Sequence, residues 1–149
     1  MTPGQLTYLT RCALEAAQAG DRRRTAEMTG RLAREADALD LVSACRVMAD
    51  IGLRALLVLY GQPNAARGEA WVLDQLGDAE GHPCRLFAAR LVTAYANADN
   101  DTVTALAAVA AGATPAERAE SLRSLATYAA GLDARAARQK NDHDGRNDR

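Results

Sequence analysis

Residues with reactive or metal-binding side chains are scarce in this chain. Its 149 residues include two histidines, three cysteines, one tryptophan, one phenylalanine and four tyrosines. Cys12, Cys45 and Cys84 are an odd number at wide spacing, so no disulfide framework is expected. His82 lies close to Cys84, but a zinc site needs more ligands than this pair supplies, and His143 is near the end of the chain. We therefore expect no metal, no cofactor and no catalytic site.

Long apolar runs and a surplus of one charge are also lacking. The longest apolar stretch, residues 51–60, is interrupted by Arg54 and is shorter than the roughly 20 residues that cross a bilayer. No charged-then-apolar signal segment opens the chain, so we expect a cytoplasmic protein without a membrane partner. Basic side chains number 18 and acidic ones 19, whereas a general nucleic-acid binder normally has a basic surplus. Nucleic acid is therefore not the expected partner.

Proline occurs only four times, and each proline stands where a helix would begin. Pro3 and Pro115 each follow a threonine and precede a glutamine or glutamate by two residues, while Pro63 and Pro83 each follow a glycine-containing turn. The arrangement around Pro3 and Pro115 is typical of a capping box, in which two side chains satisfy each other's backbone amides. The predicted boxes are Thr2 with Gln5 and Thr114 with Glu117. This division into helices leaves no room for a sheet or a phosphate-binding loop.

Apolar residues and alanines recur at helical spacing between these starts. The pattern predicts one all-α domain over residues 1–138, with antiparallel helical hairpins in a compact bundle or a short α-solenoid. The third helix is apolar on nearly all sides and is expected at the centre. Residues 139–149 offer nothing to bury and are predicted to be a disordered polar tail. The seven predicted helices are 3–19, 22–36, 41–60, 63–76, 83–97, 102–111 and 115–137.

Two stretches of the chain resemble each other. Residues 16–21 read Ala-Ala-Gln-Ala-Gly-Asp, and residues 94–99 read Ala-Tyr-Ala-Asn-Ala-Asp. One interpretation is a duplication of three-helix units, residues 3–61 and 80–137, joined by the fourth helix. The other is chance, because alanine-rich helices match one another easily.

The turns at residues 19–21, 60–62 and 94–99 resemble the joints of tetratricopeptide-type helical hairpins, over residues 5–112. They recur about 40 residues apart, where that family repeats about every 34, and the family's aromatic-leucine-glycine signature does not precede them. The resemblance implies a helical scaffold that binds other proteins.

The fourth predicted helix carries the candidate partner site. At about 100° per residue, Glu69 falls at the centre of its apolar face and Trp71 on the opposite face. A buried carboxylate needs a polar partner, and an exposed tryptophan with a polar rim is a typical protein-binding anchor. The alternative is that the helix is rotated or short, with Trp71 covering a neighbouring loop. The predicted rim of Trp71 consists of Arg67, Gln75 and Asp78.

Two further groups of charged residues have both a structural and a functional interpretation. The third helix has a polar stripe at i,i+4 spacing, which is either a solvated edge or, with Glu69, a ledge inside a ligand groove. This stripe consists of Arg46, Asp50 and Arg54. The second helix opens with three arginines, which are either neutralised by interleaved acidic residues or available to phosphates. These are Arg22, Arg23 and Arg24.

The leading hypothesis from these residues is a non-catalytic interaction or regulatory module that binds another protein or a second copy of itself. A second hypothesis is a nucleic-acid-associated regulator that uses the arginines at residues 22–24. A third is a small-molecule-binding helical domain, with the polar stripe or Glu69 inside its cavity.

Overall fold

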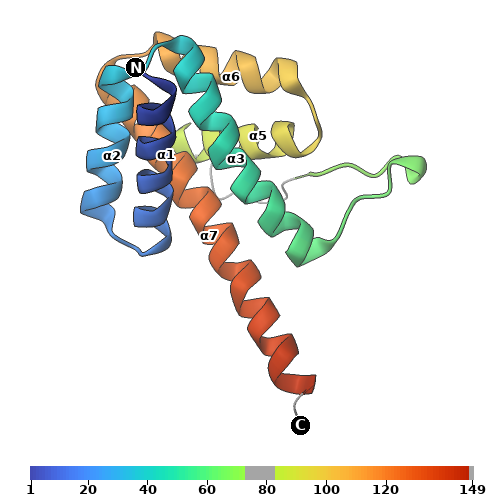
Figure 1. Cartoon of the computed structure of the whole chain (residues 1–149). Helices are drawn as coiled ribbons and strands as arrows, with labels where there is room; N and C mark the ends of the chain where they lie inside the picture. The colour runs from blue at the N-terminus through green and yellow to red at the C-terminus, as the bar shows by residue number, and fades with distance from the viewer. Residues whose placement is uncertain (73–82, 148–149) are drawn as a thin grey trace.

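The computed structural model describes residues 1–72 and 83–147 of the chain. Every regular element in these residues is helical, so the predicted all-α class is confirmed (Figure 1). The described part holds six α-helices and one short 3₁₀ helix, where the sequence predicts about seven helices. They are α1 (Pro3–Gln18), α2 (Arg22–Glu35), α3 (Ala38–Tyr60), η1 (Ala65–Arg67), α5 (Pro83–Ala96), α6 (Asn100–Gly112) and α7 (Pro115–Asn147).

The helices pack as two hairpins and two long helices. α1 lies antiparallel to α2, α5 lies antiparallel to α6, and α3 and α7 lie side by side in contact (Figure 1). α2 packs on α7, and α6 packs mainly on α3. The first hairpin thus packs through α2 on α7, the long helix that follows the second hairpin. The second hairpin packs through α6 on α3, the long helix that follows the first.

The centre of the bundle is shared by α3 and α7. α3 contacts α1, α5, α6 and α7, in agreement with its predicted central position, and α7 contacts all five other α-helices. α7 is the less hydrophobic of the two, but many of its buried residues are alanines, whose small side chains let neighbouring helices approach closely. Its buried residues are Leu122, Leu125, Ala126, Ala129, Ala130, Leu132 and Ala136. Hydrophobicity of the sequence therefore identifies α3 as a central helix but not α7.

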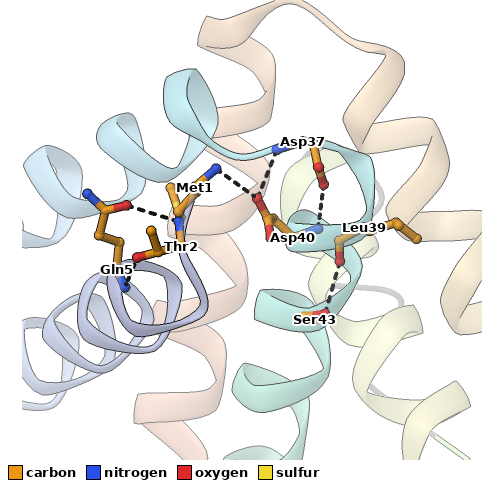
Figure 2. A network of polar contacts seen from close by, with 7 residues as sticks. All are labelled: Met1, Thr2, Gln5, Asp37, Leu39, Asp40 and Ser43. Carbon is orange, nitrogen blue, oxygen red and sulfur yellow. Dashed lines mark hydrogen bonds and ion pairs between the residues drawn. The ribbon is translucent and has the colours of Figure 1, made fainter.

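Side-chain caps fix the starts of α1 and α3. Thr2 Oγ1 accepts from the Gln5 N–H at 3.2 Å, and Gln5 Oε1 accepts from the Thr2 N–H at 3.0 Å, which confirms the predicted capping box. Figure 2 shows a second box beside it, in which Asp37 caps α3 and Asp40 is the third helical residue. The helix thus begins before the predicted start at residue 41. The Met1 amino group lies 3.9 Å from the Asp40 carboxylate, between the two boxes.

The predicted box at the start of α7 is also present. Glu117 Oε2 accepts from the Thr114 N–H at 2.9 Å, and the Glu117 N–H donates to Thr114 Oγ1 at 3.3 Å. The bond from the Thr114 N–H, together with one from the Thr114 hydroxyl to the same carboxylate oxygen at 2.9 Å, lowers the pKa of the Glu117 carboxyl. The carboxylate therefore stays ionised well below neutral pH, where it also interacts favourably with the helix dipole.

The two similar stretches of sequence fold into the same turn. Gly20 after α1 and Ala98 after α5 are both left-handed, with φ of 71° and 56°. In each turn the N–H of the next residue, Asp21 or Asp99, donates to a carbonyl five residues earlier at 2.9 Å. This is the hydrogen bond of a Schellman-type helix end. Each aspartate then caps the helix that follows. The two hairpins thus share a joint, while the duplication itself stays a prediction.

The predicted helix over residues 63–76 is wrong in its described part. Residues 61–72 form an arm that leaves the end of α3 and returns, with the short η1 at its far end (Figure 1). Asn64 caps η1, and Gly68 ends it in the left-handed conformation with φ of 72°. The Glu69 carboxylate then accepts from the Asn64 N–H at 2.7 Å. Such local side-chain hydrogen bonds compete with a regular helix. Residues 73–76 lie outside the described part.

The predicted disordered tail is also wrong as far as the structure describes it. α7 continues to Asn147, beyond its predicted end at Ala137, and its last part projects past the other helices (Figure 1). The side chains from Ala137 to Arg146 are exposed. Gln139 Nε2 donates to the Val58 carbonyl of α3 at 3.4 Å. Residues 137–140 are alanine, arginine, glutamine and lysine, all good helix formers, which favours continuation of the helix through this part without burial.

Candidate functional site

A groove runs between the arm and α7. It encloses about 790 Å³, within the roughly 300–1,000 Å³ of typical binding sites. Its walls come from three parts of the chain: the end of α3, the arm and the middle of α7. The side chains that give the groove its chemical character are Tyr60, Trp71, Tyr128, Leu132, Arg135 and Arg138. The groove therefore combines an aromatic and aliphatic wall with two cationic groups.

Trp71 is held at the groove wall through its backbone. Asn97 lies just after α5, and its Oδ1 accepts from the Trp71 N–H at 2.8 Å. The Asn97 Nδ2 donates to the Trp71 carbonyl at 3.0 Å. An amide side chain presents a donor and an acceptor side by side, so Asn97 pairs with the Trp71 backbone much as a neighbouring strand would. The indole is half-buried and packs against the core.

Replacing Asn97 with alanine removes both of these hydrogen bonds. We expect the arm to detach locally, with a red shift of Trp71 emission and stronger quenching by acrylamide. Trp71 is the one tryptophan of the chain, so both signals report on the arm. Exposed hydrogen bonds contribute roughly 1 kcal/mol each at most, so global stability from urea unfolding should fall by about 1–2 kcal/mol or less. An unchanged emission maximum and quenching constant would contradict the anchoring role of Asn97.

Arg135 connects α7 to the end of α3. Its Nη2 donates to the Tyr60 hydroxyl at 2.7 Å. Tyr128 lies two turns earlier on α7 and is partly buried, and this burial raises the pKa of its phenol although the Arg135 charge opposes the shift. Tyr128 therefore keeps its hydroxyl proton at physiological pH. The groove presents this neutral donor beside a permanently charged guanidinium group.

A second hollow, of about 760 Å³, adjoins the groove toward the C-terminal end of α7. The two hollows share Arg135 and Arg138. The other residues of the second hollow are the basic Lys140, His143 and Arg146, together with Asp142, Gln139, Val58 and Leu59. Basic side chains thus outnumber the single carboxylate among its described lining residues. The combined surface is aromatic at one end and basic at the other.

The predicted partner surface is only partly assembled. Trp71 and Glu69 both line the groove, but their predicted burial is reversed: Trp71 is half-buried and Glu69 is exposed. The reason is that no helix passes through them, since the arm carries both residues. Arg67 is exposed in η1 and does not line the groove. Gln75 and Asp78 lie outside the described residues.

Two of the three residues in the polar stripe of α3 pair with each other. Arg54 Nε lies 2.8 Å from an Asp50 oxygen, and the Tyr95 hydroxyl of α5 donates to the other at 3.2 Å. Burial, followed by the nearby Asp50 carboxylate, raises the pKa of the Tyr95 phenol. Arg46 is partly buried, and its Nε has no hydrogen-bond partner among the described residues. None of these residues lines either hollow, so the stripe forms no ledge in the groove.

The three arginines of α2 are exposed in its first turn. Asp21 caps this turn through the Arg24 N–H at 3.0 Å. Arg22, Arg23 and Arg24 form no ion pair with the described residues. Neither hollow is lined by them, so the structure does not join them to the groove.

Sequence reasoning missed the residues that α7 and the turn after α5 contribute to the site. Tyr128, Leu132 and Arg135 stand at i, i+4 and i+7, so they share one face of α7. This spacing is the signal that was available, because an aromatic and a cationic side chain continue an otherwise aliphatic face. Asn97 gave no such signal, since its role depends on a contact with Trp71 that the fold creates.

Comparison with family models, with curated proteins and with solved structures found no match to this chain. In residues 1–72 and 83–147, no helix is both long enough and apolar enough to cross a bilayer. The same residues contain no cluster of three or more histidine, cysteine or acidic side chains suited to a metal ion. The groove beside α7 is therefore the feature on which a function can be argued.

Proposed function

We propose that this chain is a non-catalytic interaction module whose groove binds a segment of another protein. The observation that carries the proposal is the aromatic wall of Trp71 and Tyr128 beside two arginines. Aromatic residues and arginine are enriched at the energetically dominant positions of protein interfaces. The described lining of the groove contains one carboxylate, Glu69, whose Oε2 accepts from the Asn64 N–H within the arm.

The length of the site favours a peptide over a compact small molecule. Tyr128 lines the groove and Arg146 lines the second hollow, and both are on α7. At about 1.5 Å per residue, the helix separates them by roughly 27 Å. A peptide segment fits such a length, whereas a compact ligand would occupy one hollow only. The resemblance of the helical joints to tetratricopeptide hairpins supports the same class of function.

Gly131 offers a direct test because it lines the groove without a side chain. A Cβ added there meets nothing within 4 Å, so Gly131→Leu should add an apolar side chain at the groove wall without crowding at its Cβ. We propose selecting phage-displayed random 12-residue peptides on the wild-type protein. Selected peptides should bind the Gly131→Leu variant at least about tenfold more weakly, a loss of roughly 1.4 kcal/mol.

The matched control is Gly4→Leu in α1, where an added Cβ also meets nothing within 4 Å. Gly4 lines neither hollow, so its variant should retain the selected peptides. Circular dichroism of both variants checks that the helices are intact. Failure to enrich any peptide, or equal binding of the peptides to Gly131→Leu and the wild type, would refute the proposed function.

A further inference from the structure

Two arginines stand at the junction of the two hollows. Arg135 and Arg138 line both the aromatic groove and the basic hollow. Arg135 donates to the Tyr60 hydroxyl. Neither arginine has a carboxylate within ion-pair distance among the described residues. A segment that lies in the groove and continues along α7 would therefore pass directly over two guanidinium groups.

The charge of the second hollow also favours a negatively charged partner. Lys140 and Arg146 add two cations beyond the shared arginines, against the single carboxylate of Asp142. The chain as a whole has a formal net charge of −1, so this basic hollow differs in sign from the rest of the molecule. Complementary charge suppresses wrong partners and speeds association with the right one.

We propose that the segment bound by this surface is acidic on one side of an apolar anchor. The inference rests on the proposed function. The anchor packs between Trp71 and Tyr128, and the partner's carboxylates pair with Arg135, Arg138 and the basic hollow. Tyr128 and these arginines are seven and ten residues apart on α7, which is about 10–15 Å. An extended chain covers that distance in about three to five residues. The first carboxylate should therefore follow or precede the anchor at that spacing.

A protein segment suits the site better than a nucleic acid. Single-stranded nucleic acids bind in grooves where cationic side chains track the phosphates beside aromatic platforms. Here the aromatic end carries Glu69, which is exposed, and the basic end carries Asp142. Both carboxylates would repel a continuous phosphate chain. A peptide tolerates them because its charges are confined to a few side chains.

The test uses the full chain and the groove-dependent peptides selected on it. We expect aspartate or glutamate to be enriched at three to five residues from a leucine, phenylalanine or tryptophan. Fluorescein-labelled versions then give dissociation constants by anisotropy. Replacing their acidic residues with glutamine should weaken binding by about tenfold or more, and raising the salt concentration should weaken the acidic peptides further.

Charge reversal on the protein separates this inference from a general loss of fold. Arg138 is exposed and makes no hydrogen bond to the described residues, so Arg138→Glu should fold normally. It should weaken the acidic peptides by about tenfold, and peptides with lysine in place of the acidic residues should regain affinity for it. Arg23→Glu is the control: Arg23 is also exposed but lies on α2, and its reversal should leave binding unchanged.

The outcomes also separate this inference from the proposed function. Groove-dependent peptides without enriched acidic residues, or equal effects of Arg138→Glu and Arg23→Glu, would overturn the acidic partner and leave the proposed function standing. If the wild type binds a 12-nucleotide oligouridylate and Gly131→Leu abolishes this binding, both the acidic partner and the proposed function are overturned. If sedimentation shows a dimer that the Gly131→Leu variant does not form, the occupant of the groove is a second copy of the chain and the acidic segment is ruled out.

Discussion

Replacing Leu125 with alanine is expected to lower the free energy of unfolding by about 3 kcal/mol. Leu125 is fully buried in α7, the helix that contacts all the other α-helices. Leucine-to-alanine changes at such positions lose the transfer free energy of the removed atoms and leave a cavity, at a total of roughly 2–5 kcal/mol. Alanine is at least as good a helix former as leucine, so the loss reports on packing alone.

Urea unfolding followed by circular dichroism measures this effect. A domain of about this size loses roughly 2–4 °C of melting temperature per kcal/mol, so a decrease of roughly 6–12 °C should accompany the change. Leu39→Ala is the matched control, because Leu39 is 78% exposed on α3 and its loss should stay within about 0.5 kcal/mol. Similar losses for the two variants would contradict the central position of α7.

The helices were predictable where the sequence satisfies backbone groups locally. The Thr2–Gln5 and Thr114–Glu117 boxes each consist of residues three apart, so their hydrogen bonds follow from the order of the residues. Gly61 likewise ends α3 with a positive φ of 71°. In these places the information needed to define an element lies within one helical turn.

The arm could not be predicted by the same reasoning. Residues 65, 69, 72 and 73 recur at helical spacing, so periodicity favours a helix. The competing structure depends on Asn64, whose side chain caps η1 and whose N–H binds Glu69. It also depends on the pairing of Trp71 with Asn97, which is 26 residues away in the chain. A long-range contact of this kind overrides local propensity and leaves no periodic signal.

The candidate site was half predictable for a related reason. Helical spacing predicts Trp71 as an exposed anchor with a polar rim, and Trp71 does line the groove, although it is half-buried. Its partners Tyr128 and Arg135 belong to α7, and only the packing of α7 against α3 brings them to the arm. The polar stripe on α3 gave the opposite result. Asp50 pairs with the exposed Arg54 and accepts from Tyr95, whereas the Nε of Arg46 has no partner among the described residues. None of the three lines the groove.

Replacing Gly52 with valine is the second change expected to have a large effect. A Cβ at Gly52 would lie 3.1 Å from Val92 Cγ1 of α5 and 3.7 Å from Leu132 Cδ1 of α7. Three helices thus approach one another at a position that has no side chain. Carbon atoms in good contact are about 3.5–4.0 Å apart, so the larger side chain must push α3 away from α5. Overpacking of this kind typically lowers stability by about 1–3 kcal/mol, and we expect the upper end of that range.

Gly131→Ala is the control that separates crowding from helix propensity. An added Cβ meets nothing within 4 Å at Gly131, so this change should raise stability by up to about 1 kcal/mol, the usual gain for glycine to alanine in a helix. Urea unfolding of both variants gives the comparison. Leu132 also lines the groove, so Gly52→Val should weaken binding of the selected peptides as well. Unchanged stability and unchanged binding would contradict the close packing of α3, α5 and α7 at this point.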